Sequence, residues 1–146
     1  MARLVVGEAF GARAKVVTHS PMFYVHWELQ PGAQAQLPAE YPERAAFVAA
    51  GAVDIDGQSC AAGRMVTFAP GKPVSFRAET HASVMLLGGE PIGERFIEWN
   101  FVSSSKDRIE QAKADWRAGR MKLPDLDNQE FIPLPGGPPP PANPMS

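Results

Sequence analysis

Residues 31–71 read PGAQAQLPAEYPERAAFVAAGAVDIDGQSCAAGRMVTFAPG and decide the fold. Glycine or proline interrupts this stretch every few residues, and the segments between them are short and mostly apolar. Asp56-Gly57 is the strongest hairpin-turn dipeptide of the chain. Short strands at this spacing, with no helical pattern between them, predict an antiparallel sandwich or barrel. The strands expected within and next to this stretch are 44–51, 52–55, 64–68 and 73–78.

The preceding segment, residues 22–30, reads MFYVHWELQ and continues the pattern. Larger apolar side chains alternate there with more polar ones, and a period of two predicts a strand that buries one face. The residues expected on the buried face are Phe23, Val25, Trp27 and Leu29. A further strand is expected at 82–87, and the short apolar or β-branched pieces 4–6 and 15–18, separated by Gly7 and Gly11, are consistent with an edge strand and a turn. The fold class predicted for residues 1–101 is therefore all-β.

One helix is predicted after this β region, over residues 105–118. Ser104 or Ser105 can cap its first turn, and Gly119 can end it. Its apolar stripe is narrow, so we expect the helix to lie across the barrel surface rather than to build a core.

The expected organisation is one domain over residues 1–120, including the helix, and a Pro-rich tail over 121–146. Phe131, Ile132 and Leu134 could dock, whereas the closing GGPPPPANPMS is expected to be extended or disordered.

Composition limits the classes of function. The 146 residues carry a net charge of -2 with scattered Lys and Arg, which gives no electrostatic footprint for nucleic acid. No apolar run approaches the roughly 20 residues that span a bilayer, and the N-terminal apolar stretch is too short for a secretion signal. The single Cys60 excludes an internal disulfide and agrees with a reducing compartment. We therefore expect a cytoplasmic protein that binds neither DNA nor a membrane.

The glycines of the opening stretch, Gly32, Gly51, Gly63 and Gly71, resemble the frame of the two cupin motifs. In that family the first motif is glycine, five residues, His-x-His, a Glu, and a glycine six residues later. The second is glycine, five residues, Pro-x-Gly, two residues, His. The resemblance implies a cupin fold, an RmlC-like jelly-roll β-barrel.

The positions that carry the metal ligands in cupins are occupied here by Pro38, Glu40, Arg44 and Val74. An iron site needs three or four inward imidazole or carboxylate donors, and only Glu40 is a possible donor among the four. Val74 is also in phase with Phe76 and Ala78, which predicts an apolar inner face. The metal site is therefore expected to be degenerate, with no catalytic residue, no cofactor-binding residue and no metal.

Residues 86–120, LLGGEPIGERFIEWNFVSSSKDRIEQAKADWRAGR, resemble the C-terminal half of bacterial pirins, including the Gly-Glu-Pro and Trp-Asn-Phe-Val-Ser-Ser signatures. Residues 7–33 resemble the segment that begins the second cupin of a pirin. A complete pirin has two cupin barrels, and its iron site of three histidines and a glutamate lies in the N-terminal barrel. The resemblance implies activities such as quercetin 2,3-dioxygenase or co-regulation of transcription, which belong to two-domain proteins.

Several other residues could suggest chemistry. His19, His26 and His81 are expected to be exposed or hydrogen-bonded rather than to share a metal, with His26 on the polar face of its strand. Cys60 has no basic neighbour in sequence that would lower its pKa, so a spectator thiol is expected. Trp99 and Trp116 could mark a contact surface or fill the space between barrel and helix.

The loop around the degenerate motif leaves two alternatives open. Glu40 and Glu43 could form an acid-base pair at the barrel mouth, or belong to an ordinary polar loop. Arg44 could hold an anionic ligand in the vacated site, or pair with one of these glutamates.

Our first hypothesis is a metal-free, non-catalytic pirin-like cupin that acts as a structural or protein-interaction module. An apolar face left uncovered would favour a homodimer, or pairing with a metal-bearing cupin or pirin domain. The alternative is a pirin-type dioxygenase that holds iron with non-standard ligands such as Glu40, His26 or His81. A third possibility is that the chain is the back half of a two-domain pirin.

Overall fold

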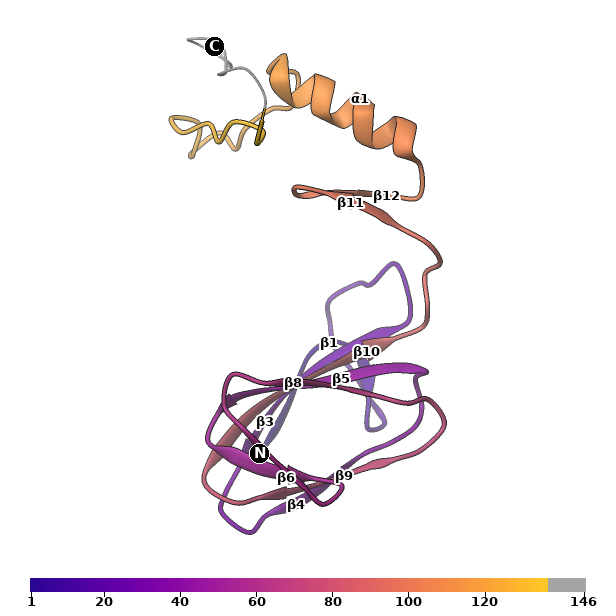
Figure 1. Ribbon diagram of the computed structural model, residues 1–146, viewed down its shortest axis with the longest axis vertical. Coiled ribbons are helices and arrows are strands. Elements are labelled where there is room, and N and C mark those ends of the chain that lie inside the picture. The colour runs from indigo at the N-terminus through magenta and orange to yellow at the C-terminus, as the bar shows by residue number, and fades with distance from the viewer. Residues whose placement is uncertain (137–146) are drawn as a thin grey trace. The chain divides into compact units, whose positions relative to one another are not determined.

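The computed structural model describes residues 1–136, and internal contacts divide the chain after Ile92 into two compact units. The first unit, residues 1–92, consists of two antiparallel sheets whose inner faces form one core (Figure 1). The second unit begins at Gly93 and contains a short hairpin and a helix. The expected all-β class, with one helix near the C-terminal end, is confirmed for the described residues.

The larger sheet has six strands in the order β2-β1-β3-β10-β5-β8. Their bounds are β1 Ala2–Ala9, β2 Ala12–Arg13, β3 Met22–Leu29, β5 Glu43–Ala50, β8 Met65–Phe68 and β10 Ala82–Gly89. The long strand β10 lies between β3 and β5 and pairs with both. These three strands therefore form the centre of the sheet.

The smaller sheet has four strands in the order β4-β9-β6-β7. Their bounds are β4 Gln34–Leu37, β6 Ala52–Ile55, β7 Gln58–Ala61 and β9 Val74–Ala78. Asp56 and Gly57 join β6 to β7 with φ of 48° and 87°, the left-handed pair that a two-residue hairpin turn requires. The turn predicted from this dipeptide is confirmed.

The core between the sheets follows the period-two pattern of β3. Phe23, Val25, Trp27 and Leu29 are each at most 7% exposed, as the alternation predicted. From the smaller sheet, the Phe76 ring meets Trp27 edge-on with ring centroids 5.3 Å apart. Aromatic side chains of both sheets thus fill the middle of the barrel.

Gly51 shows why the opening stretch needs glycine at one of its frame positions. Its φ is +75°, and a Cβ built there would lie 2.1 Å from the carbonyl oxygen of His81. Any other residue would clash with the backbone that leads into β10. The close approach holds the end of β5 against the loop before β10.

Of the two pieces consistent with an edge strand and a turn, 4–6 belongs to β1 and 15–18 forms no strand. The chain instead turns at Gly11 into the two-residue β2, and residues 14–21 run without strand structure. Val16 and Val17 are 56% and 83% exposed, so their β-branched side chains find no sheet face to pack against. Strand propensity without a packing partner does not form a strand.

The second unit contains the hairpin β11 Phe96–Glu98 and β12 Phe101–Ser103, followed by helix α1 Lys106–Arg117. The predicted helix, residues 105–118, is confirmed to within a residue at each end. Ser105, one of the two expected caps, accepts a 3.4 Å hydrogen bond from the backbone N–H of Arg108. The placement of this helix across the barrel stays a prediction.

An aromatic cluster holds the second unit together. Trp116 stacks on Phe131 with centroids 4.8 Å apart and meets Trp99 at 5.4 Å. Its indole N–H donates a 2.9 Å hydrogen bond to the carbonyl of Ile132. Leu134 is buried, whereas the side chain of Ile132 is exposed. The segment after the helix therefore docks through Phe131 and Leu134.

The closing residues 137–146 of the expected tail lie outside the described residues. Within residues 1–136, no helix combines the length and apolar composition that crossing a membrane requires. The division into a domain over 1–120 and a tail over 121–146 stays a prediction.

Candidate functional site

The four positions that hold metal ligands in cupins lie at one end of the barrel. Pro38 and Glu40 are in the connection between β4 and β5, Arg44 is in β5, and Val74 begins β9. Glu40 is exposed, whereas Val74 is 4% exposed and belongs to the core cluster. No donor set therefore converges at these positions.

Arg44 is the buried charge of this barrel end, with 3% of the residue exposed. Its Nη1 donates to the carbonyl of Pro38 at 2.9 Å, and its Nη2 donates to the carbonyls of Ala69 and Lys72 at 2.7 and 2.8 Å. The guanidinium thereby joins the β4–β5 connection to the β8–β9 connection. Its Nε is buried without a hydrogen-bond partner. Among residues 1–136, neither Glu40 nor Glu43 forms an ion pair with Arg44, so the structure does not favour this alternative.

The strands on both sides of Arg44 bring inward side chains of the larger sheet together around it. The register places Arg44 between Phe68 of β8 and Gly88 of β10, and Gly88 pairs on its other side with Phe23. A Cβ at Gly88 would lie 2.6 Å from the Phe23 ring and 2.4 Å from the carbonyl oxygen of Glu43. The absence of a side chain at Gly88 leaves room for the Phe23 ring at this end of the barrel.

Tyr41 anchors the connection between β4 and β5, and no sequence pattern identified it as a candidate site residue. Its hydroxyl donates a 2.9 Å hydrogen bond to the carbonyl of Glu8, and its ring meets Phe23 at 5.3 Å. Burial raises the pKa of Tyr41, and the nearby carboxylates of Glu8, Glu40 and Glu90 raise it further. The hydroxyl is therefore a stable donor at neutral pH, and it ties the loop to β1.

Glu40 and Glu43, one alternative for an acid-base pair, form no hydrogen bond with each other in the described part of the chain. Both residues are exposed. Cys60 is 5% exposed and packs in the core as a small apolar side chain.

Two of the three histidines meet around one carboxylate. Nε2 of His26 lies 2.8 Å from Oε1 of Glu28, and Nε2 of His81 lies 3.4 Å from Oε2. Nε2 of His26 also lies 2.9 Å from the hydroxyl of Ser83. His26 projects from the outer side of its strand and His81 lies in a loop, as predicted. The approach of both side chains to Glu28 was not predicted.

This cluster lacks the geometry of a catalytic triad. In a triad one ring nitrogen faces the hydroxyl and the other faces the carboxylate. Here the same nitrogen of His26 contacts both Ser83 and Glu28, so no proton relay connects them. Over residues 1–136, no group of three His, Cys, Asp or Glu side chains is placed to hold a metal ion.

The outer faces of the two sheets differ in chemistry. On the smaller sheet the side chains that point outward are polar or small, namely Gln34, Gln36, Ala52, Asp54, Ser59, Ala61, Ser75 and Arg77. On the larger sheet one group of neighbouring outward side chains is mostly apolar, and we call it the outer face: Val6, Tyr24, Ala45, Phe47, Met65, Thr67, Met85 and Leu87. Polar side chains flank it on the same side of the sheet, namely Arg3, His26, Glu28, Glu43 and Ser83. Strands that are apolar on both sides are typical of sheets covered on both faces.

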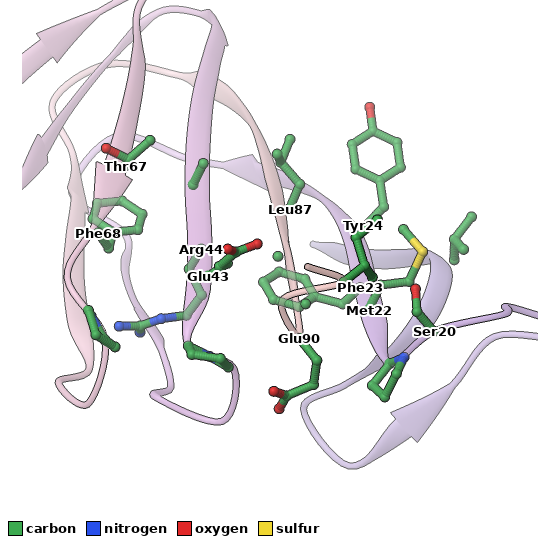
Figure 2. A pocket seen from close by; sticks show the side chains of 18 residues that line it. Ser20, Met22, Phe23, Tyr24, Glu43, Arg44, Thr67, Phe68, Leu87 and Glu90 are labelled. Carbon is green, nitrogen blue, oxygen red and sulfur yellow. The ribbon is translucent and has the colours of Figure 1, made fainter. Parts of the chain in front are cut away.

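A groove of about 1010 Å³ lies at one end of the outer face (Figure 2). Tyr24, Leu87, Ala45 and Thr67 form one row of its wall, in register across four strands. Glu43 and Glu90 also line it, and both are exposed. Inward residues of the sheet line it as well, namely Phe23, Arg44, Phe68 and Gly88. The groove is therefore largely apolar, reaches the guanidinium at the end of the barrel, and has carboxylates at its margin.

Comparison with known proteins accounts for this fold. Residues 24–122 match the profile of the Pirin C-terminal cupin domain. The chain belongs to the pirin family. A pirin-like protein of Caulobacter vibrioides is 69% identical over 134 residues, which are 92% of this chain and 46% of that protein. Pirin-1 of Arabidopsis thaliana is 29% identical over 124 residues, which are 79% of this chain and 43% of that protein.

Solved structures confirm the cupin fold of this pirin domain. A quercetin 2,3-dioxygenase from Acinetobacter baumannii superposes with a TM-score of 0.80 at 23% identity, over 94% of this chain and 48% of that one. The chain thus spans about half the length of the relatives it matches. The predicted resemblance to the C-terminal half of pirins is confirmed.

The residues of this pirin domain do not fit the iron site that the family implies. A site of three histidines and a glutamate needs four converging donors. Here the corresponding positions present a proline, an exposed carboxylate, a buried guanidinium and a core valine. A buried positive charge would also repel a divalent cation.

Proposed function

We propose that this pirin domain is a metal-free, non-catalytic module that acts by protein contact, docking its outer face on a second cupin. The partner is another copy of the chain or a metal-bearing cupin. Direct binding to nucleic acid or to a membrane forms no part of this function, and we place the protein in the cytoplasm.

The observation that carries the proposal is the difference between the two outer faces. Met85 and Phe47 lie side by side on β10 and β5, and Met65 of the neighbouring edge strand is 58% exposed. The smaller sheet presents glutamines, serines and charged groups at the equivalent positions. Contiguous apolar surface on one face alone marks an interaction site.

Docking is tested by the mass of the particle in solution. Light scattering behind size-exclusion chromatography should give twice 15.8 kDa for the wild type across a dilution series. Met85→Lys should weaken the dimer at least about tenfold, because a cation would be buried at the centre of the contact.

Gln36→Lys is the matched control, because it places the same charge on the outer side of the smaller sheet and should leave the mass unchanged. A wild type that stays monomeric at every concentration would contradict self-pairing. Mixing with a purified metal-bearing cupin would then show whether a mixed complex forms, and its absence would reject the docking function.

A second candidate function is a dioxygenase of pirin type, favoured by the fold likeness to quercetin 2,3-dioxygenase. Iron would then depend on the non-standard ligands Glu40, His26 and His81. His26 and His81 approach the carboxylate of Glu28, and no group of three such side chains over residues 1–136 is placed to hold a metal. We expect untagged protein to contain less than about a tenth of an equivalent of iron, nickel, copper, manganese or zinc. Stoichiometric metal with oxygen uptake on a flavonol would replace our proposal with this one.

A further inference from the structure

The two ends of the outer face carry charges of opposite sign. At the groove end, Glu43 is the outward residue of β5, and Glu90 follows β10 (Figure 2). Neither carboxylate forms an ion pair with another group of residues 1–136. Arg44, the nearest cation in sequence, is turned inward and buried. The two outward charges of the sheet at this end are therefore negative, and Lys72 of the β8–β9 connection is an exposed cation of the same barrel end.

The other end presents a free cation. Arg3 of β1 lies in register with His26 of β3, and both belong to the outer side of the sheet. Glu28, the carboxylate of this end, already contacts His26 and His81. Arg3 is exposed and makes no ion pair within the described part of the chain. Across the sheet, the row that contains Arg3 and His26 continues through Met85, Phe47 and Met65, and the row between it and Glu43 consists of Val6, Tyr24, Leu87, Ala45 and Thr67.

This distribution restricts how a second copy can cover the face. When two identical faces stack, their two-fold axis lies in the plane of contact. An axis parallel to the line from Arg3 to Glu43 places each charge over its own equivalent, which is unfavourable. An axis perpendicular to that line places each Arg3 over Glu43 of the other copy. The second arrangement forms two equivalent ion pairs around one apolar centre.

Resting on the proposed docking function, we infer that the partner is a second copy of this chain, oriented by Arg3 and the carboxylates Glu43 and Glu90. The apolar residues supply the attraction, because burial of apolar area dominates association. The charges choose one orientation among those that bury the same area. A cupin with a different distribution of charge would lack this complementarity.

Charge reversal tests the orientation. Glu43→Arg and Arg3→Glu should each raise the dimer dissociation constant about five- to tenfold at an ionic strength of about 50 mM, measured by sedimentation equilibrium. The double variant carries the reversed pair and should return to within about twofold of the wild type. At about 0.5 M salt the four proteins should converge, since exposed charges are then screened.

Arg77→Glu is the control, because it reverses one charge on the outer side of the smaller sheet and should change nothing. Single variants that dimerise like the wild type, or a double variant no better than the weaker single one, would overturn the orientation while leaving the docking function intact. A wild type that never dimerises would overturn the inference of a second copy, and the docking function would fall only if the mixed complex is also absent. Thermal unfolding of each variant separates weakened pairing from loss of the fold.

Discussion

Replacing Arg44 with methionine should lower the free energy of unfolding by about 3–5 kcal/mol. The guanidinium is 3% exposed and donates to three carbonyl oxygens, those of Pro38, Ala69 and Lys72. Methionine fills a similar volume but donates no hydrogen bond, so three carbonyl acceptors of part-buried hydrogen bonds lose their partner together. The measurement is urea unfolding followed by tryptophan fluorescence.

Arg44→Lys separates the hydrogen bonds of Arg44 from its charge, and Arg77→Met is the control. Arg44→Lys keeps the charge but cannot reach three carbonyls with a planar fork, so we expect an intermediate loss. Arg77→Met removes an exposed arginine and should change stability by less than about 0.5 kcal/mol. An Arg44→Met protein as stable as the wild type would show that the carbonyls find water instead.

Arg44 joins two loops at the end of the barrel, as a bound metal would join its ligands. A bound cation joins ligands that come from different strands, and the guanidinium joins carbonyls of two loops. Arg44→Glu would therefore restore the residue type that the cupin motif carries without restoring a site. It would bury a carboxylate opposite three carbonyl oxygens, and we expect it to be less stable than Arg44→Met.

The sequence could predict elements that repeat a local pattern. The alternation in 22–30 has a period of two over a whole strand, and Asp56-Gly57 requires a left-handed turn whatever surrounds it. The strands β4 and β7 escaped prediction because QAQL and QSCA are short and carry polar or small residues. Each strand pairs along its own whole length with a neighbouring strand. The sequence of a four-residue segment alone does not indicate such pairing.

The candidate site was less predictable, because its contacts join residues distant in sequence. The motif spacing identified position 44, and charge alone suggested an ion pair or an anion. The partners of Arg44 include the backbone carbonyls of Ala69 and Lys72. Because every residue has a carbonyl, no residue type in the sequence indicates such a partner. The outer face did leave a signal, since AAFVA in β5 and VMLL in β10 are apolar at successive positions. Such runs indicate a strand covered on both sides.

Replacing Phe76 with alanine should lower the free energy of unfolding by about 3–5 kcal/mol. The side chain is 2% exposed and meets Trp27 and Phe68 edge-on, with centroids 5.3 and 6.0 Å apart. Removing it opens a cavity in the middle of the barrel and separates two aromatic pairs at once. Chemical denaturation with intrinsic fluorescence measures the loss.

Ser75→Ala is the control, because the neighbouring side chain points to solvent and its loss should be worth less than about 0.5 kcal/mol. Phe76→Leu should lose less than Phe76→Ala, since it keeps part of the buried volume. Phe76 shares its side of β9 with Val74, the position of a cupin ligand. A loss below about 1 kcal/mol on removing the ring would mean that the interior is loosely filled. A loosely filled interior could admit a ligand or ion. That result would contradict our proposal that this domain is a metal-free barrel packed by aromatic rings.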